Sequence, residues 1–170
     1  MNTSAEVTQL ETPLKPCLPA ALVSSTAFLL GRVGMAVKMR VIDQLGQAGC
    51  GGYAYGVLVI LGEGAQETQA AIADSLGVDR SQLVGVLDTL EQDGLVERKR
   101  DPNDRRRHAV SITAHGKREL VRLRATVKEI EESILEPLDE KDRKALHEAL
   151  FQVAANLDPR YDAGRASSAA

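Results

Sequence analysis

The sequence predicts a mainly α-helical fold that carries one small β-hairpin. Apolar residues recur at helical spacing through most of the chain, and a single pair of short segments has β-branched residues on both sides of a turn sequence. Aromatic residues make up 3% of the 170 residues and Trp is absent. The core is therefore built from Leu, Val, Ile and Ala, which suits packed helices. The length allows one globular domain with a sizeable core.

The first two helices are expected at Pro19–Leu45 and Tyr53–Leu61. Glycine is a strong helix stopper. The GQAGCGG run at 46–52 should therefore end the first helix, and the Gly62/Gly64 pair should end the second. The apolar positions that predict the first helix are Leu22, Leu29, Val33, Ala36, Val37 and Val41.

Two further helices are expected in quick succession, joined by a tight turn. Thr68 is a suitable N-cap for the first of them, and Gly77 ends it. Asp79 caps the second, with Gln82 three residues later in a capping-box arrangement, and Gly94 follows its end. Two helices joined by a three- or four-residue turn that contains Gly form a helix-turn-helix. Their apolar faces comprise Ala71, Ile72, Leu76, Leu83, Val86, Leu87 and Leu90.

A hairpin should follow the helix pair. Leu95–Arg100 and His108–Thr113 read as short strands, and the DPNDRRR run between them is typical of a turn. Adding this hairpin gives a winged helix-turn-helix.

Two helices should close the chain. Thr113 can cap a long helix from Ala114 to about Leu135, and Pro137 breaks that pattern. Asp139 can cap a last helix, whose apolar stripe consists of Leu146, Leu150, Val153 and Leu157. The expected organisation is a flexible arm (1–16), an N-terminal helix and loop (17–52), a lobe with the helix-turn-helix and hairpin (53–113), C-terminal helices (114–158) and a flexible tail (159–170).

Charge is distributed unevenly along the chain. The formal net charge is −3, which alone argues against a nucleic-acid binder. Residues 79–124, however, hold eleven Lys or Arg against eight Asp or Glu, while both flanking segments are net acidic. A basic surface is thus concentrated around the predicted helix-turn-helix and hairpin.

The second helix of the pair is expected to read DNA. Its first turn exposes Arg80, Ser81 and Gln82. Such N-terminal residues of a recognition helix point at base edges in the major groove, where Arg suits guanine and Gln suits adenine. The competing interpretation is an ordinary solvated helix face.

The hairpin tip carries three consecutive arginines, Arg105, Arg106 and Arg107. Like charges in a row repel, and folding alone gives no reason for them. The negative potential of a narrow minor groove attracts inserted Arg, and Asp104 could orient one guanidinium. The alternative is a charged hairpin that contacts only solvent.

Taken together, these segments resemble the MarR family, the multiple-antibiotic-resistance regulators. The resemblance is densest over 76–116, LGVDRSQLVGVLDTLEQDGLVERKRDPNDRRRHAVSITAHG, and extends more weakly over about 20–158. Its marks include Asp93-Gly94-Leu95-Val96, the Asp104-x-Arg106 wing signature and Ile112-Thr113-x-x-Gly116. The chain departs from many relatives at Val84 and Gly85, where they carry polar or basic residues. Val84 could contact a thymine methyl group, and Gly85 would allow close approach of the backbone.

The resemblance implies a homodimeric regulator that binds a pseudo-palindromic operator on double-stranded DNA, with Arg106 in the minor groove. The segments 17–52 and 114–158 would then supply the dimerisation helices, and 53–113 would be the DNA-binding lobe. It also implies a small-molecule effector pocket between the first, second and fifth helices. The candidate DNA-binding residues are Thr68, Arg80, Ser81, Gln82, Val84, Gly85, Asp104, Arg105, Arg106 and Arg107. The candidate ligand-binding residues are Arg32, Arg40, Tyr53 and Tyr55. The candidate dimer-interface residues are Leu29, Val33, Leu146, Leu150 and Val153.

Other functions remain as alternatives. One branch of the family senses hydroperoxides through a cysteine that would fall near Phe28, so Cys17 and Cys50 raise the question of redox sensing. A winged-helix adaptor that binds protein rather than DNA is a second alternative, although it would not need the three arginines. The three His residues lack metal-ligand spacing, and neither a nucleophile elbow nor a phosphate loop is present. We expect no catalysis, no cofactor, no metal and no membrane segment, and a cytoplasmic location.

Overall fold

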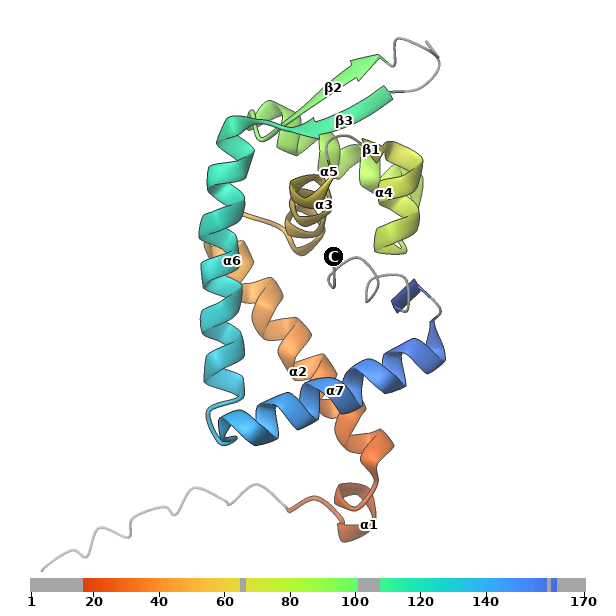
Figure 1. Cartoon of the computed structure of the whole chain (residues 1–170), viewed down its shortest axis with the longest axis vertical. Coiled ribbons are helices and arrows are strands. Elements are labelled where there is room, and N and C mark those ends of the chain that lie inside the picture. The colour runs from red at the N-terminus through yellow and green to blue at the C-terminus, as the bar shows by residue number, and fades with distance from the viewer. Residues whose placement is uncertain (1–16, 65–66, 101–107, 159, 162–170) are drawn as a thin grey trace, which may run out of the picture. The chain divides into compact units, whose positions relative to one another are not determined.

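The computed structural model describes residues 17–64, 67–100, 108–158 and 160–161, and divides into two units, 1–36 and 37–170 (Figure 1). It confirms a mainly helical fold with a small antiparallel sheet. Two helices begin the described chain, α1 (Ala20–Val23) and α2 (Thr26–Gln47).

The prediction of a single helix at Pro19–Leu45 is wrong at its start, because the helical conformation is interrupted between α1 and α2. The hydroxyl of Ser25 accepts a hydrogen bond from the backbone N–H of Phe28 at 3.3 Å and so opens a new helix. The other end of α2 lies close to the predicted position. Gly49 takes a left-handed conformation (φ 78°), and the N–H of Cys50 closes the end on Leu45 O at 2.8 Å.

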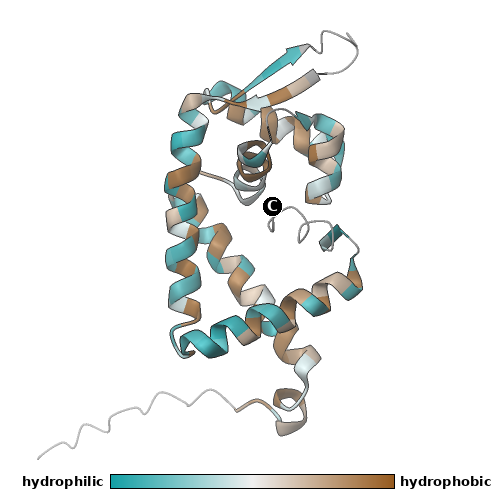
Figure 2. Ribbon diagram, viewed as in Figure 1, coloured by the Kyte–Doolittle hydropathy of each residue, from teal (hydrophilic) through white to brown (hydrophobic). Residues whose placement is uncertain are grey.

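Helix α3 (Gly52–Glu63) is the central element of the second unit, and Figure 2 colours much of it as hydrophobic. It contacts α4, α5, α6 and strand β3. Val57, Leu58 and Leu61 are completely buried. The helix ends at the predicted Gly62/Gly64 pair, and Gly62 lies in its last turn, where α6 packs against it. A Cβ on Gly62 would lie 2.5 Å from Leu120 Cδ2, and it is Gly64 that ends the helix.

The predicted helix-turn-helix is present as α4 (Gln69–Leu76) and α5 (Arg80–Gln92). Gly77 (φ 62°) makes the turn between the two helices. Gly94 (φ 68°) lies just after α5, and there the N–H of Leu95 closes on Leu90 O at 2.8 Å. The buried faces are those predicted, with Ile72, Leu83, Leu87 and Leu90 in the core.

Three strands form one antiparallel sheet in the order β1-β3-β2. The predicted hairpin is β2 (Val96–Arg100) and β3 (His108–Ile112), which pair from Val96 with Ile112 to Arg100 with His108. The third strand, β1 (Glu67–Thr68), was not predicted. It pairs with β3 through only two residues and is too short to show an alternating pattern.

Two helices end the chain, α6 (Ala114–Ile134) and α7 (Glu140–Leu157). Thr113 caps α6 and Asp139 caps α7, as predicted, with acceptor distances of 2.9 and 2.8 Å. Hydrophobic and hydrophilic residues alternate along α6 in Figure 2, because one face of this helix packs on α3. Helix α7 has no fully buried residue.

Within the described ranges, no single helix is long and apolar enough to cross a bilayer. By length and composition alone, α2 and α3 taken together could span a bilayer, but the axes of the two helices are bent by 86°.

Candidate nucleic-acid interface

The N-terminus of α5 is an exposed helix end with a defined cap. The Asp79 carboxylate accepts from the backbone N–H of Ser81 at 2.7 Å and from its hydroxyl at 2.5 Å. These bonds, the hydroxyl bond first, lower the pKa of Asp79, so the cap is ionised at neutral pH. A backbone hydrogen bond from Gln82 also lowers this pKa, and it corresponds to one of the two bonds of the predicted capping box. Arg80 and Gln82 are exposed beside this cap.

The outer face of α5 continues the exposed surface. Val84 is 41% exposed, and nothing lies within 4 Å of where a Cβ on Gly85 would be. One turn further on, the Thr89 hydroxyl donates to Gly85 O at 3.1 Å. The α5 residues selected from the sequence therefore lie along one exposed strip, while Leu83 and Leu87 anchor the opposite side in the core.

Thr68 serves both the sheet and α4. Its hydroxyl accepts from the N–H of Ala71 at 3.1 Å, and its backbone pairs with Ala109 of β3. The side chain is half-buried and accepts one bond as a cap, while its O–H can still donate, so Thr68 stays a candidate for a phosphate contact.

An ion-pair cluster that the sequence reasoning missed joins the hairpin to α5. Arg98 of β2 pairs with Asp88, and its Nε donates to Glu91 Oε2 at 2.9 Å. The backbone N–H of Arg98 donates to the other oxygen of Glu91 at 3.1 Å. The Arg98 side chain is only 18% exposed, and its hydrogen bond lowers the pKa of Glu91.

This cluster has two consequences. It fixes the hairpin to helix α5, and the guanidinium offsets one of the two carboxylate charges that would otherwise repel phosphates. The sequence does contain two acidic residues in α5 and a basic residue in the following strand, Asp88, Glu91 and Arg98. Their pairing could not be predicted, because it depends on how β2 lies against α5, and local sequence patterns do not contain that information.

The tip of the hairpin lies outside the described residues. Asp104, Arg105, Arg106 and Arg107 all fall in this segment. The strands that lead to it are described, and Figure 1 shows them extending beyond α4 and α5. In β2, Lys99 pairs with Glu97 at 2.7 Å, and the Ser111 hydroxyl donates to the same Glu97 oxygen at 3.2 Å.

The structure does not bring the four candidate ligand residues into one described cavity. Arg40 donates to the Ser133 hydroxyl at 3.2 Å, Tyr53 is exposed, and Tyr55 packs against the core. Arg32 is exposed in the first unit.

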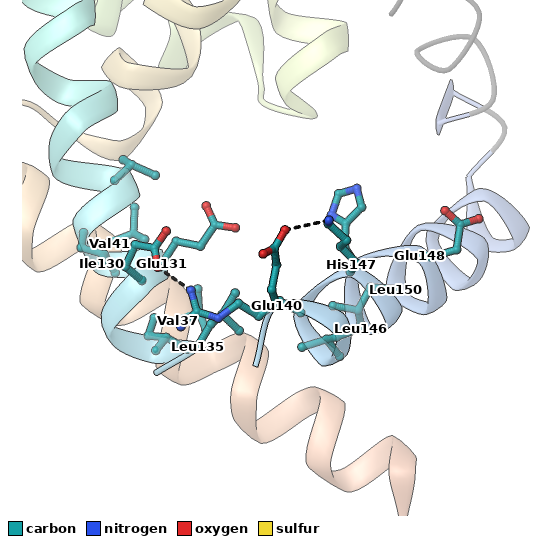
Figure 3. Close-up of a pocket in the computed structure, with 15 residues that line it drawn as sticks. Val37, Val41, Ile130, Glu131, Leu135, Glu140, Leu146, His147, Glu148 and Leu150 are labelled. Atoms are coloured by element: carbon teal, nitrogen blue, oxygen red, sulfur yellow. Dashed lines mark hydrogen bonds and ion pairs between the residues drawn. The ribbon is translucent and has the colours of Figure 1, made fainter. Parts of the chain in front are cut away.

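A cavity of about 700 Å³ lies elsewhere in the second unit, lined by the end of α2, by α6 and by α7 (Figure 3). Its apolar wall includes Val37, Val41, Ile130, Leu146 and Leu150, and charged side chains such as Glu131, Glu140 and Arg143 also line it.

Cys50 has the properties of a structural thiol. It is 7% exposed, burial raises its pKa, and its Sγ donates to Gly51 O at 3.5 Å. A protonated, covered thiol is a poor nucleophile, which argues against redox sensing there. Cys17 is exposed near the start of the described chain. Over the ranges that the structure covers, no group of three or more His, Cys, Asp or Glu residues is arranged to hold a metal.

The helix pair, the exposed α5 face and the two-stranded hairpin define a winged helix-turn-helix DNA-binding protein. The model of the MarR family matches residues 54–108. A transcriptional regulator of the MarR family from Rhodococcus sp. RHA1 is 33% identical, with a TM-score of 0.70, over 80% of this chain and 96% of that one. This chain therefore belongs to the MarR family, and is a transcriptional regulator rather than an enzyme.

Two further structures are similar, both of the repressor CouR. CouR from Rhodococcus jostii RHA1 bound to p-coumaroyl-CoA is 30% identical (TM-score 0.67), over 80% of this chain and 96% of that one. CouR bound to a 23-mer DNA duplex is 28% identical (TM-score 0.73), over 82% and 99%.

A relative from Thauera aromatica, described as a putative transcriptional regulatory protein for the hcr operon, is 33% identical over 92 residues. The match spans 54% of this chain and 55% of that protein.

Proposed function

We propose that this protein is a homodimeric repressor that binds a pseudo-palindromic operator and is released from it by a small aromatic or acyl ligand. The observation that carries the proposal is the exposed first turn of α5, where Arg80 and Gln82 flank a capped helix N-terminus. A helix end of this kind offers base-reading side chains and phosphate-binding N–H groups at the same place. CouR, which shares the fold, has been captured on a DNA duplex.

The test of DNA binding is a mobility shift with the full chain on the intergenic DNA beside its own gene, at two salt concentrations. A specific complex that survives competition by random duplex at the higher salt supports the proposal. Binding that random duplex removes completely would refute operator recognition and favour the adaptor alternative.

Exposed apolar residues support the dimer. Leu29 and Val33 are exposed on α2, and Leu146, Leu150 and Val153 are exposed along one side of α7. Leu146 and Leu150 also line the 700 Å³ cavity. Exposed apolar surface of this kind marks an interaction site, and a second copy of the chain is the occupant that a two-fold operator requires. Half-sites should then lie about one helical turn apart, roughly 34–36 Å.

Light scattering at micromolar concentration tests the dimer. The wild-type protein should have twice the mass of the chain, and Leu150→Glu should lower that mass because it places a carboxylate in an apolar interface. Lys141→Glu, which also adds negative charge to α7, should leave the mass unchanged. A wild-type monomer would contradict the proposal.

The ligand class follows from the relatives and from the predicted residues. CouR is bound to p-coumaroyl-CoA, an aromatic acyl thioester. Arg32 and Arg40 could supply the positive charge that an acidic ligand needs, and Tyr53 and Tyr55 could contact an aromatic ring. An inducer must bind the DNA-incompetent conformation more tightly, since equal affinity for both conformations shifts nothing.

A thermal-shift screen with p-coumarate, p-coumaroyl-CoA and benzoyl-CoA, followed by mobility shifts, tests this part. A compound that raises the melting temperature and also releases the operator supports the inducer role. A compound that raises the melting temperature but leaves operator affinity unchanged is not an inducer.

A further inference from the structure

The chain that follows α7 returns to the DNA-reading lobe. Arg160 lies two residues after Asp158, the residue that ends α7. Its Nη1 donates to the backbone carbonyl oxygen of Asp74 at 2.8 Å, in the last turn of α4. The contact spans 86 residues of sequence and joins the end of the last helix to the first helix of the helix-turn-helix.

The end of α4 favours a positive partner. The last carbonyl groups of a helix carry partial negative charge and lack intrahelical donors. The last turn of α4 has no basic residue of its own, and Asp74 O otherwise accepts a long 3.3 Å bond from the N–H of Gly77. Arg160 therefore supplies the cation that this helix end lacks.

Arg160 is itself held against α7 from two sides. Its Nε donates to both carboxylate oxygens of Asp158, at 3.0 and 2.9 Å, and its Nη2 donates to Asp158 Oδ2 at 2.6 Å. The next residue, Tyr161, packs edge-on against Phe151 of α7, with 6.5 Å between the ring centroids. These contacts with Asp158 and α7 hold the guanidinium in the orientation in which it donates to Asp74 O.

The position of this contact allows it to restrain the orientation of α5. The lobe is joined covalently to α6 through Thr113, and Arg160 contacts a different helix of the lobe, α4, at Asp74. Helix α4 leads into the reading helix α5 through a two-residue turn, Gly77-Val78, before the Asp79 cap. A contact that holds the end of α4 therefore limits how far α5 can pivot about α6.

We infer that Arg160 is a positioning residue for operator binding, which holds the reading helix at a fixed orientation to α7. The inference rests on the proposed function, since orientation matters only if two lobes of a dimer must match two half-sites. The contact carries no base specificity. It makes the dimer selective for the distance between half-sites, because a freely pivoting lobe would tolerate a changed distance.

The experiment measures this selectivity directly. The full-length wild-type protein first selects an operator from random-sequence DNA, and two further duplexes change its half-site spacing by one base pair in either direction. Dissociation constants on the three duplexes give a spacing penalty for wild type, Arg160→Ala, Arg160→Lys and Lys141→Ala. Light scattering and melting temperature are measured on the same samples.

Arg160→Ala should reduce the spacing penalty about fivefold, the change in an equilibrium constant expected for one exposed, charge-assisted hydrogen bond. Arg160→Lys, which keeps the charge but loses the fork that grips Asp158, should recover part of the penalty. Lys141→Ala removes the same charge from the start of α7 and should match wild type.

Three outcomes would overturn the inference. The first is an Arg160→Ala protein with the wild-type spacing penalty. The second is an equal loss of affinity on all duplexes together with a lower melting temperature, since this would make Arg160 merely structural. The third is a wild-type protein that selects no sequence, which would remove the proposed function as well, whereas the first two leave it standing.

Discussion

Gly116 lies in the first turn of α6, where the helix starts against the backbone of the preceding loop. Thr113 anchors this start, because its N–H donates to Leu95 O at 3.0 Å and its hydroxyl donates to Gly94 O at 2.7 Å. A Cβ on Gly116 would lie 2.1 Å from Leu95 O and 2.8 Å from Ile112 Cγ1. We therefore expect Gly116→Ala to destabilise the protein.

Two opposing effects set the magnitude. Replacing Gly by Ala inside a helix gains about 1 kcal/mol of helix propensity. Overpacking costs about 1–3 kcal/mol, and the clash at Gly116 lies at the upper end of that range because its nearest neighbour is a tethered carbonyl that cannot change rotamer. The expected net loss is about 2 kcal/mol, or a fall in melting temperature of about 4–8 °C for a chain of this length.

Two other glycines provide matched controls. Nothing lies within 4 Å of a Cβ on Gly85 in α5, so Gly85→Ala should stabilise the protein by about 0.5–1 kcal/mol. A Cβ on Gly56 in α3 would meet only Leu76 Cδ2, at 2.7 Å, and a small rotation of that side chain should bring the net effect close to zero.

Chemical denaturation at one fixed protein concentration measures all three variants, since the stability of the proposed dimer would depend on concentration. The expected order of stability is Gly85→Ala, then Gly56→Ala, then Gly116→Ala. A Gly116→Ala protein as stable as wild type would refute the steric argument and the reason given for glycine in the Ile112-Thr113-x-x-Gly116 motif.

Three further predictions concern the reading unit. Arg80→Ala or Gln82→Ala should weaken operator binding by ~1–3 kcal/mol, and binding to random DNA by less; equal losses on both, in fluorescence anisotropy, would mean phosphate contacts only. Arg106→Ala should weaken binding most on A·T-rich flanks and reduce the slope of log K against log salt by up to about one; wild-type affinity at ~150 mM salt would exclude the minor-groove contact. Because Arg98 lowers the pKa of Glu91, their ion pair stabilises the fold above the ordinary glutamate value of 4.5 and loses its contribution as the pH falls through the lowered folded value. Arg98→Met should therefore cost about 0.5–1 kcal/mol at pH 7 in denaturant titrations, and this cost should shrink as the pH is lowered below 4.5; a cost that does not change with pH would contradict the assignment.

The helix ends of the reading lobe could be predicted because caps are local. Thr68, Asp79 and Thr113 each accept from a backbone N–H two or three residues ahead, so residue type and spacing carry the whole signal. Gly77 and Gly94 end their helices with positive φ, which again depends only on the residue itself.

Features that depend on tertiary partners were missed. Strand β1 exists because β3 offers it an edge, and the Arg98 cluster exists because β2 lies against α5. The break at Ser24–Ser25 belongs to a different class, since its signal was local. The apolar pattern continued across it, and the serine cap took precedence over that pattern.

The apolar stripes of α2 and α7 mark the limit of reasoning from one chain. Periodicity in the lobe and in these helices looks alike in the sequence, yet Leu83 and Leu87 are buried while Leu146, Leu150 and Val153 are exposed. Exposing apolar surface to water costs free energy, so a regular apolar stripe on an exposed helix face indicates that another molecule covers it. The cavity that Leu146 and Leu150 line has an apolar wall and is also lined by charged side chains. A second copy of the chain, the partner proposed above, would cover the stripe and would also match the two-fold symmetry of the proposed operator.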